Sequence, residues 1–276
     1  MSMILREGLS ITPPLRAVVE KLWVSDGGAA PAVAREHTLP TGAMSLVLRL
    51  SGPPLRLFDS AAQELGLCIV GGARERLYVR AGAAPGRSVG AQLRPGASQW
   101  LLGVPALALA HRHTPLDQLW GSTAEALRQR LAAEAAPLRA LDLFEAALLA
   151  RLATPRPALP AALAFALAAF ARGQRVDAVV QASGFSHRHF NALFGAAVGL
   201  TPKAFCRVQR FQTLLTAMAA GPARPLAELA LDAGYSDQAH MSREFSGIAG
   251  LTPSAYRRIA PVQINHVPMP PASLRT

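Results

Sequence analysis

Cysteine, lysine and long apolar runs are scarce in this chain of 276 residues. Its two cysteines, Cys68 and Cys206, form neither a disulfide framework nor a metal-binding spacing. The longest apolar run, residues 161–171, is too short to span a bilayer. The opening residues MSMILREGLS lack the basic and apolar regions of a secretory signal. These absences favour a soluble cytoplasmic protein with no membrane partner.

Catalytic and cofactor-binding motifs are also missing. The chain contains no GxSxG, HExxH, GxxxxGK(S/T) or Rossmann glycine pattern, and its acidic residues are scattered. The histidines at 187 and 189 would diverge on a helix, and the pair at 111 and 113 follows a helical-looking segment and has no third ligand nearby. We therefore expect no enzyme activity, no cofactor and no metal site.

The net charge of +11 comes from 28 Lys and Arg against 17 Asp and Glu. A basic chain suits a nucleic-acid partner. The excess is spread along the chain, however, with 17 basic against 12 acidic residues in 1–160 and 10 against 5 in 161–260. Since only Lys21 and Lys203 are lysines, an arginine-rich coding bias explains part of the charge. Charge alone permits a DNA partner without establishing one.

The first 121 residues favour strands. Gly- and Pro-rich punctuation separates short β-prone stretches at 44–50, 55–58, 67–72 and 76–81. This spacing predicts a small antiparallel barrel or sandwich-like domain for residues 1–121, with a sensing or dimerising role. Residues 122–160 read as a helical connector that ends in the Pro-rich linker TPRPALP. Residues 261–276 lack periodicity and are expected to be a flexible tail.

The region 161–260 contains a repeat. GLTPKAF at 199–205 recurs as GLTPSAY at 250–256, and VDAVVQASGFS at 176–186 aligns with LAELALDAGYS at 226–236. The second copy holds one extra residue between these segments. Similarity that survives an insertion is more than shared composition, so we interpret the two copies as two equivalent structural units.

Each copy predicts a helix-turn-helix followed by a third helix. Gly184 and Gly234 end the first helix, where a left-handed backbone is needed. Ser186 and Ser236 are expected to cap the second helix. In both GLTP segments Gly closes the second helix, Thr caps the third and Pro occupies its first turn. The predicted fold class is therefore multidomain α+β with an all-α double helix-turn-helix domain at 161–260.

Residues 172–260 resemble the DNA-binding domain of the AraC/XylS family, in which a long helix joins two helix-turn-helix subdomains. The specific match is LAELALDAGYSDQAHMSREFSGIAGLTPSAYRR, and the joining helix would be residues 201–220. Residues 40–121 more weakly resemble an uncharacterised β-rich sensor-like domain that precedes such DNA-binding domains. The stretches that show this resemblance include LPTGAMSLVLRL and GAQLRPGASQWLLGVPALAL. This second resemblance implies no particular ligand.

A recognition helix offers the outward side chains of its N-terminal half to base edges in the major groove. Arginine can bind guanine through two acceptors, and asparagine can pair with adenine. Position 192 is often arginine in the family but alanine here, so the first unit has one base contact fewer. Carried over by position, the expected base-reading residues are Arg188, Asn191, Gln238, His240, Ser242 and Arg243. The expected phosphate contacts or helix caps are Ser186, Ser236, Lys203 and Arg257.

These features predict a sequence-specific DNA-binding transcription regulator of the one-component, ligand-responsive kind. Double-stranded DNA is its expected partner. RNA polymerase, an unidentified small-molecule effector and a second copy of the chain are further partners that this function allows. The alternative is a β-barrel that binds a small molecule or metal, with or without catalysis, and for which DNA binding is secondary.

Overall fold

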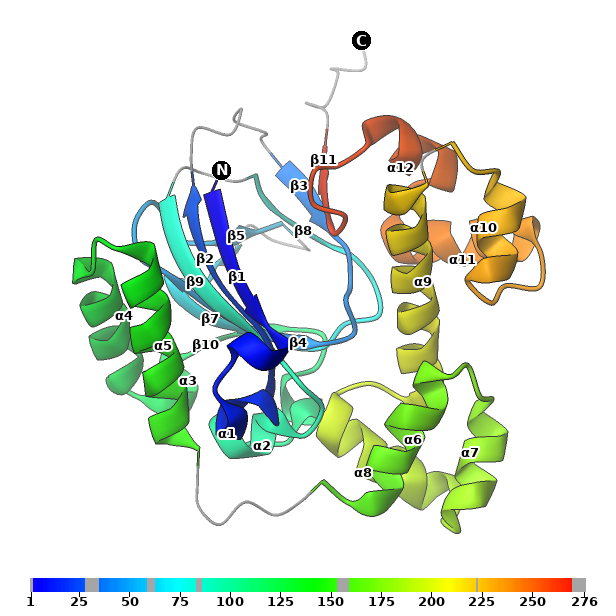
Figure 1. Cartoon of the computed structure of the whole chain (residues 1–276), viewed down its shortest axis with the longest axis horizontal. Coiled ribbons are helices and arrows are strands. Elements are labelled where there is room, and N and C mark those ends of the chain that lie inside the picture. Colours follow the sequence, from blue (N-terminus) through cyan, green and yellow to red (C-terminus); the bar gives the residue numbers. More distant parts are fainter. Residues whose placement is uncertain are drawn as a thin grey trace.

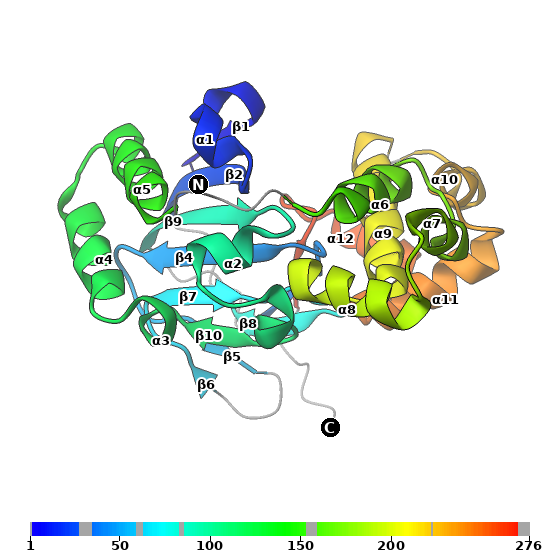
Figure 2. The same ribbon diagram turned by 90° about the horizontal axis from the view of Figure 1, so that it is seen from below.

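A computed structural model describes residues 2–27, 35–58, 63–82, 86–152, 159–221 and 223–269. Apart from one strand at residues 266–268, the sheets are built from the first part of the chain and are flanked by helices, whereas the elements between residues 161 and 259 are helices (Figure 1). Figure 2 shows this helical region on one side of the sheets, with α4 and α5 on the other. The expected multidomain α+β fold is confirmed.

The larger sheet has six antiparallel strands in the order β1-β2-β9-β4-β7-β10. Its strands are β1 (Ser2–Glu7), β2 (Val19–Gly27), β4 (Met44–Arg49), β7 (Cys68–Gly71), β9 (Gly86–Leu93) and β10 (His113–Pro115). Side chains alternate between its two faces. In β4, Leu46 and Leu48 lie in the hydrophobic core, while Ser45 and Val47 face a cavity on the other side.

The smaller sheet has five strands in the order β11-β3-β8-β5-β6. They are β3 (Arg35–Thr38), β5 (Arg56–Leu57), β6 (Gln63–Glu64), β8 (Tyr78–Ala81) and β11 (His266–Pro268). Within the described part of the chain the two sheets do not join, so the barrel that the sequence allowed is not closed. The sandwich-like alternative fits better, because both sheets line the cavity between them.

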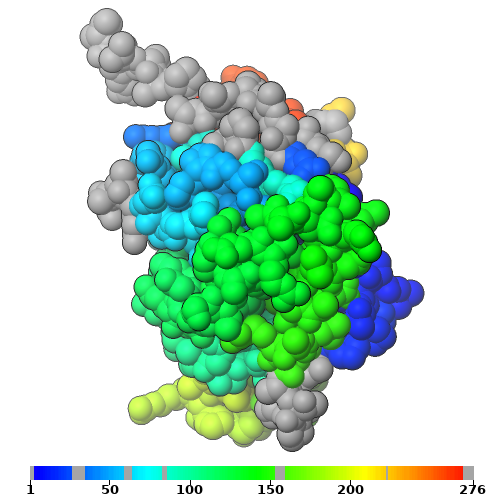
Figure 3. Space-filling model, turned by 90° about the vertical axis from the view of Figure 1, so that its left-hand side faces the viewer, coloured from blue at the N-terminus to red at the C-terminus, as the bar shows by residue number. Residues whose placement is uncertain are grey.

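Helices cover the outer face of the six-stranded sheet. Figure 3 shows α4 (Thr123–Ala133) and α5 (Pro137–Arg151), in green, forming much of that face of the molecule. Phe144 and Leu148 of α5 are fully buried in the same core as Leu46. The segment expected to connect two domains therefore packs on the sheet. The Pro-rich linker lies outside the described residues except for its last two positions.

Short helical segments complete this part of the chain. They are η1 (Gly8–Ser10), α1 (Pro13–Arg16), α2 (Ala97–Leu101), η2 (Ala106–Leu109) and α3 (Asp117–Trp120). An ion pair of 2.8 Å joins Arg6 Nη1 of β1 to Glu145 Oε2 of α5, and Glu145 Oε1 accepts the amide hydrogen of Thr12 at 2.6 Å. No described helix is long and apolar enough to cross a membrane.

The helical region consists of two three-helix units at opposite ends of the long helix α9 (Figure 1). The first unit contains α6 (Ala161–Ala171), α7 (Val176–Ser183) and α8 (His187–Val198). After α9 (Pro202–Ala220), the second contains α10 (Leu226–Asp232), α11 (Gln238–Ala249) and α12 (Pro253–Ile259). Phe190 and Phe194 are buried in the first unit, and Phe245 is buried against Phe211 of α9 in the second.

The helix end and helix start predicted from GLTP are confirmed in both copies. Gly199 and Gly250 end α8 and α11 with φ values of 84° and 69°, where a side chain would strain the backbone. Thr201 Oγ1 accepts the Ala204 amide and Thr252 Oγ1 accepts the Ala255 amide, each at 3.2 Å. The two caps therefore start α9 and α12 in the same way.

The end of the chain differs from the expected flexible tail. Strand β11 pairs antiparallel with β3, matching His266 with Thr38 and Pro268 with Glu36. The Leu39 amide also donates to the Asn265 carbonyl at 2.8 Å. A three-residue strand has too little periodicity to detect in a sequence, because its partner lies more than 200 positions away and determines the pairing.

Candidate nucleic-acid interface and cavity

The first recognition helix, α8, presents a polar face beside a buried aromatic one. Ser186 Oγ accepts the His189 amide at 3.3 Å and caps the helix as expected. Arg188 and Asn191 are both exposed, whereas Phe190 between them is fully buried. The two predicted base readers of this unit therefore lie on the accessible side of α8, near its N-terminus.

The opposite face of α8 packs against the β-rich part of the chain. The Ala197 carbonyl accepts the amide hydrogen of Gly96 at 2.8 Å. The buried residues Phe190, Phe194 and Val198 belong to the same apolar cluster as the core of the six-stranded sheet. This contact leaves the polar face of the helix exposed and holds the first unit firmly against the sheet region.

The second recognition helix, α11, is capped by Asp237 rather than by Ser236. Asp237 Oδ1 accepts the His240 amide at 2.7 Å, and Ser236 Oγ donates to Asp237 Oδ2 at 3.1 Å. The one-residue insertion in the second copy moves the helix start by one position, so a serine aligned with Ser186 no longer occupies the cap. This backbone hydrogen bond, with that from Ser236, lowers the pKa of the exposed Asp237 carboxyl.

The four predicted base readers of α11 differ in exposure. Gln238 and Arg243 are exposed, but His240 and Ser242 are half-buried. The His240 ring lies edge-on to Tyr235 with the ring centroids 5.4 Å apart, and its Nδ1 is 3.0 Å from Ser236 Oγ. Gln238 and Arg243 are therefore the side chains best placed to reach a base from this helix.

A charged contact fixes the orientation of α11 on the long helix. Arg210 of α9 donates to Glu244 through two nitrogens, from Nη2 to Oε2 at 3.0 Å and from Nε to Oε1 at 3.2 Å. The Arg210 guanidinium also lies over the Tyr235 ring, 4.8 Å from its centroid. Such a bidentate pair constrains geometry more than a single contact does. The recognition helix thus keeps a defined angle to α9.

The two predicted phosphate contacts are placed unequally. Lys203 is exposed in the first turn of α9. Arg257 in α12 is half-buried, and its Nε and Nη2 atoms are enclosed with no hydrogen-bond partner among the described residues. Lys203 is therefore the better candidate for a phosphate contact.

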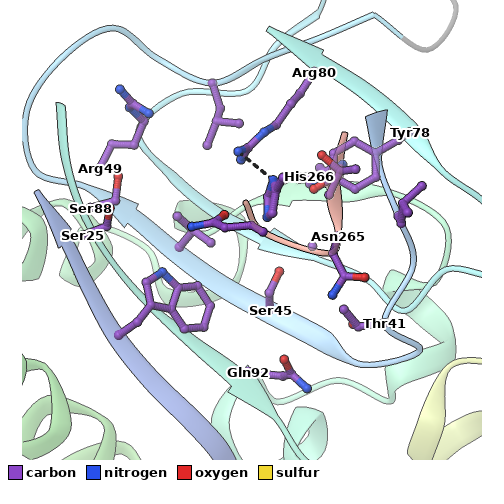
Figure 4. A pocket seen from close by; sticks show the side chains of 18 of the residues that line it. Ser25, Thr41, Ser45, Arg49, Tyr78, Arg80, Ser88, Gln92, Asn265 and His266 are labelled. Carbon is purple, nitrogen blue, oxygen red and sulfur yellow. Dashed lines mark hydrogen bonds between the residues drawn. The ribbon is translucent and has the colours of Figure 1, made fainter. Parts of the chain in front are cut away.

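A second candidate site is a cavity of about 870 Å³ between the two sheets. Arg49 and Ser45 reach it from the larger sheet, and Arg80 and His266 reach it from the smaller one (Figure 4). Trp23 covers part of its wall on β2, directly opposite Gly90 of β9. A Cβ at Gly90 would come within 2.2 Å of the indole, so the glycine allows the ring to lie flat there.

Arginines dominate the electrostatics of this cavity. Burial and the positive charges of Arg74 and Arg80 lower the pKa of His113 to about 3. Burial and the charge of Arg80 likewise lower the pKa of Arg49. Arg80 forms an ion pair with Glu36, whose Oε1 also lies 2.9 Å from His266 Nδ1. Burial acts to raise the pKa of Glu36, but these two partners hold it below its ordinary value.

Little in the sequence indicates this cavity. The alternation along β4 could have shown that Ser45, Val47 and Arg49 share one face, and that an arginine there is unusual for a half-buried strand. Nothing local to residues 262–266 indicates that they line the same space. Within the ranges described, no group of three or more His, Cys, Asp or Glu residues is arranged to hold a metal ion.

Comparisons with known proteins agree with this geometry. Residues 166–259 match the model of a helix-turn-helix domain family, and residues 11–115 match a domain of unknown function, DUF6597. No curated protein sequence matches the chain at a significant level.

The comparison with solved structures returns matches with TM-scores below 0.5 and low sequence identity. ToxT from Vibrio cholerae has a TM-score of 0.47 and 10% identity over 94% of this chain and 98% of its own. ToxT with a bound unsaturated fatty acid has a TM-score of 0.46 and 9% identity, with coverages of 92% and 94%. The xylose-binding transcription activator XylR has a TM-score of 0.30 and 19% identity over 52% of this chain and 39% of its own. Residues 166–259 thus match a helix-turn-helix domain family of the AraC type, and residues 11–115 before them match the DUF6597 family.

Proposed function

We propose that the chain is a one-component transcription regulator that reads two adjacent major grooves with α8 and α11. The supporting observation is the duplication: two capped recognition helices with exposed polar N-terminal faces are joined by the single helix α9. A rigid connection of this kind suits successive grooves on one face of the duplex.

Arg188 and Asn191 would read bases from α8, and Gln238 and Arg243 from α11, because all four are exposed. His240 and Ser242 remain candidates for a contact from the half-buried edge of α11. Ser186 and Lys203 would face phosphates, as would Ser236, whose capping role Asp237 has taken. Alanine at position 192 can contact only a thymine methyl, so the first half of the operator would depend on fewer side chains.

The β-rich part would supply the response to a small molecule through the cavity between its sheets. Ligand pockets of proteins commonly have volumes of this order. A second copy of the chain and RNA polymerase are further proposed partners, and cytoplasmic action follows from the proposed role on DNA. Catalysis is not part of the proposal.

Footprinting of the full chain on an operator selected from random DNA tests the two-groove arrangement. We expect two protected patches on one face, about 34 Å or one helical turn apart. The variant Arg243→Ala should weaken one patch and leave the other. A single short patch for the wild-type chain would contradict the model of two reading helices.

A further inference from the structure

Four strands form the margins of the two sheets, and three of them are protected against further pairing. β10 and β11 have three residues each and end in Pro115 and Pro268, and β6 has two residues. Proline has no amide hydrogen to donate, and a very short edge offers little to a partner strand. These features are typical of sheet edges that remain unpaired in solution.

The fourth margin, β1, has none of these features (Figure 2). Its six residues, SMILRE, include no proline or lysine, and they pair with β2 without a bulge. Arg6 forms ion pairs with Asp142 and Glu145 of α5, and a carboxylate oxygen of Glu7 lies 3.7 Å from Lys21 Nζ of β2. β1 is therefore an open edge whose charged side chains pair within the same chain.

Two hydrogen bonds of Ser10 show which backbone groups of β1 point away from β2. Ser10 Oγ accepts the Glu7 amide hydrogen at 2.9 Å and donates to the Glu7 carbonyl at 2.8 Å. Along an antiparallel ladder, residues alternate between bonding to the neighbouring strand and pointing away from it. Met3 and Leu5 therefore direct their amide and carbonyl groups outward, as Glu7 does. Among the described residues, no backbone group bonds to them from that side.

The side chains along this edge are apolar and accessible. Met3 is 46%, Leu5 43% and Leu9 87% exposed, so three of the ten large apolar side chains exposed in the described part of the chain fall within residues 3–9. Met3 and Leu5 lie on the face of the sheet that lines the cavity, whereas Ile4 packs against the core on the other face. Free hydrogen-bonding groups beside exposed apolar side chains make an edge a template for another strand.

Ser10 also restricts the register in which a second β1 can pair with the first. Because Ser10 occupies the backbone groups of Glu7, Met3 and Leu5 are the described outward-pointing residues that remain open. A two-fold axis at Ile4 brings Met3 of each copy opposite Leu5 of the other, and each of these pairs can exchange two backbone hydrogen bonds. Apolar side chains then meet across the axis, and the two Arg6 residues do not oppose each other.

We propose that β1 is the docking edge for a second copy of this chain, which adds its own β1 antiparallel and joins the two six-stranded sheets into one. The edge is self-complementary, as a two-fold interface requires. Each β1 is also already ordered against β2, so pairing loses little conformational freedom. The edge is small beside a standard interface of about 20–30 residues a side, so we expect a reversible dimer at micromolar concentrations.

The proposal specifies where the second copy named under the proposed function binds, and its test uses no DNA. It can therefore fail while the DNA-binding function stands. Analytical ultracentrifugation of the full chain, from nanomolar concentrations to about 100 µM, should show monomers at the low end and dimers at the high end. A two-fold interface closes at two copies. A chain that stays monomeric throughout, or that assembles beyond dimers, overturns the proposal, whichever other partner the edge binds.

Two double variants at the same positions test the register. Met3→Lys with Leu5→Lys places like charges opposite each other in both pairs and should weaken the dimer about tenfold. Met3→Lys with Leu5→Glu places opposite charges in both pairs and should associate about as tightly as the wild type. The variants share both positions and one substitution, and comparison of their melting temperatures checks that folding is equally preserved. Equal dissociation constants for the two variants overturn the pairing of Met3 with Leu5.

Ile4→Cys tests the two-fold axis without relying on charge. Residues opposite each other at a non-hydrogen-bonded position have Cα atoms about 4.5 Å apart, within reach of a disulfide. Mild oxidation at pH 7 should therefore give a covalent dimer. Burial raises the pKa of the Cys68 and Cys206 thiols to about 11, so these native thiols react slowly at that pH.

Leu9→Cys is the control for this cross-link. Leu9 is more exposed than Ile4 but lies five positions from the proposed axis, so its thiol should not reach the same residue of the second copy. Covalent dimers that form equally in both variants would show random collision and overturn the axis at Ile4.

Discussion

The recognition helices show that a residue's role can be predicted from the sequence more easily than its exposure to solvent. Arg188 and Arg243 are expected base readers because of their positions in the recognition helices of the family that the sequence resembles, and both lie exposed on their helices. His240 and Ser242 are expected base readers on the same ground, but both are half-buried, His240 against the ring of Tyr235. The exposure of a side chain depends on its tertiary neighbours, and the position of a residue in a helix does not reveal them.

If Arg188 and Arg243 each bind a guanine edge, Arg188→Ala and Arg243→Ala should each cost about 1–3 kcal/mol on the best site. The loss should be local, because a base contact acts at one or two positions of its own half-site. Full binding motifs, measured by selection from random DNA for each variant, check this.

Lys203→Ala is the control for these variants. A phosphate contact carries no sequence information, so its loss should weaken all sequences alike and make the slope of log affinity against log salt shallower by about one. Arginine variants that behave in the same uniform way would show that Arg188 and Arg243 do not read bases.

Helix ends are the elements for which sequence reasoning worked best. Thr201 and Thr252 cap their helices as predicted, because a cap involves a side chain and an amide three residues on. Ser236 is the exception, since the inserted residue places Asp237 at the cap. An N-cap side chain is present as predicted, but the alignment of the two copies placed it one residue too early.

Asp237→Ala should therefore destabilise α11 more than Ser236→Ala does. Because folding lowers the pKa of Asp237, its contribution is present at pH 7 and is lost as the pH falls through the folded-state value. Hydrogen exchange of the α11 amides at pH 7 and in acid measures both effects. A larger effect of Ser236→Ala at pH 7 would return the capping role to the serine.

At the scale of the whole molecule, residues from the two ends of the chain lie together in the β-rich part. Its last described strand pairs with β3, and the tail completes a cavity that begins at β1 and β2. The expected order of sensor, connector, DNA-binding domain and tail is thus linear in sequence but not in space. The expected connector packs on a sheet, and the tail joins the other sheet.

The sequence by itself determined the two helix-turn-helix units, because caps, glycine stops and apolar spacing act within a few residues of each other. It also determined that the first region is rich in strands, through short β-prone stretches separated by glycine and proline. These are local patterns, and one chain is enough to show them.

Only the tertiary structure decided how the strands form two sheets, that a cavity lies between them and that the tail lines it. Pairing of β11 with β3, and the contact of Gln212 with Asn265, join residues 53 to more than 200 positions apart. Such contacts depend on which surfaces remain to be covered after the local elements have formed. A three-residue strand carries too little pattern to reveal its partner, so its place follows from the packing of the whole chain.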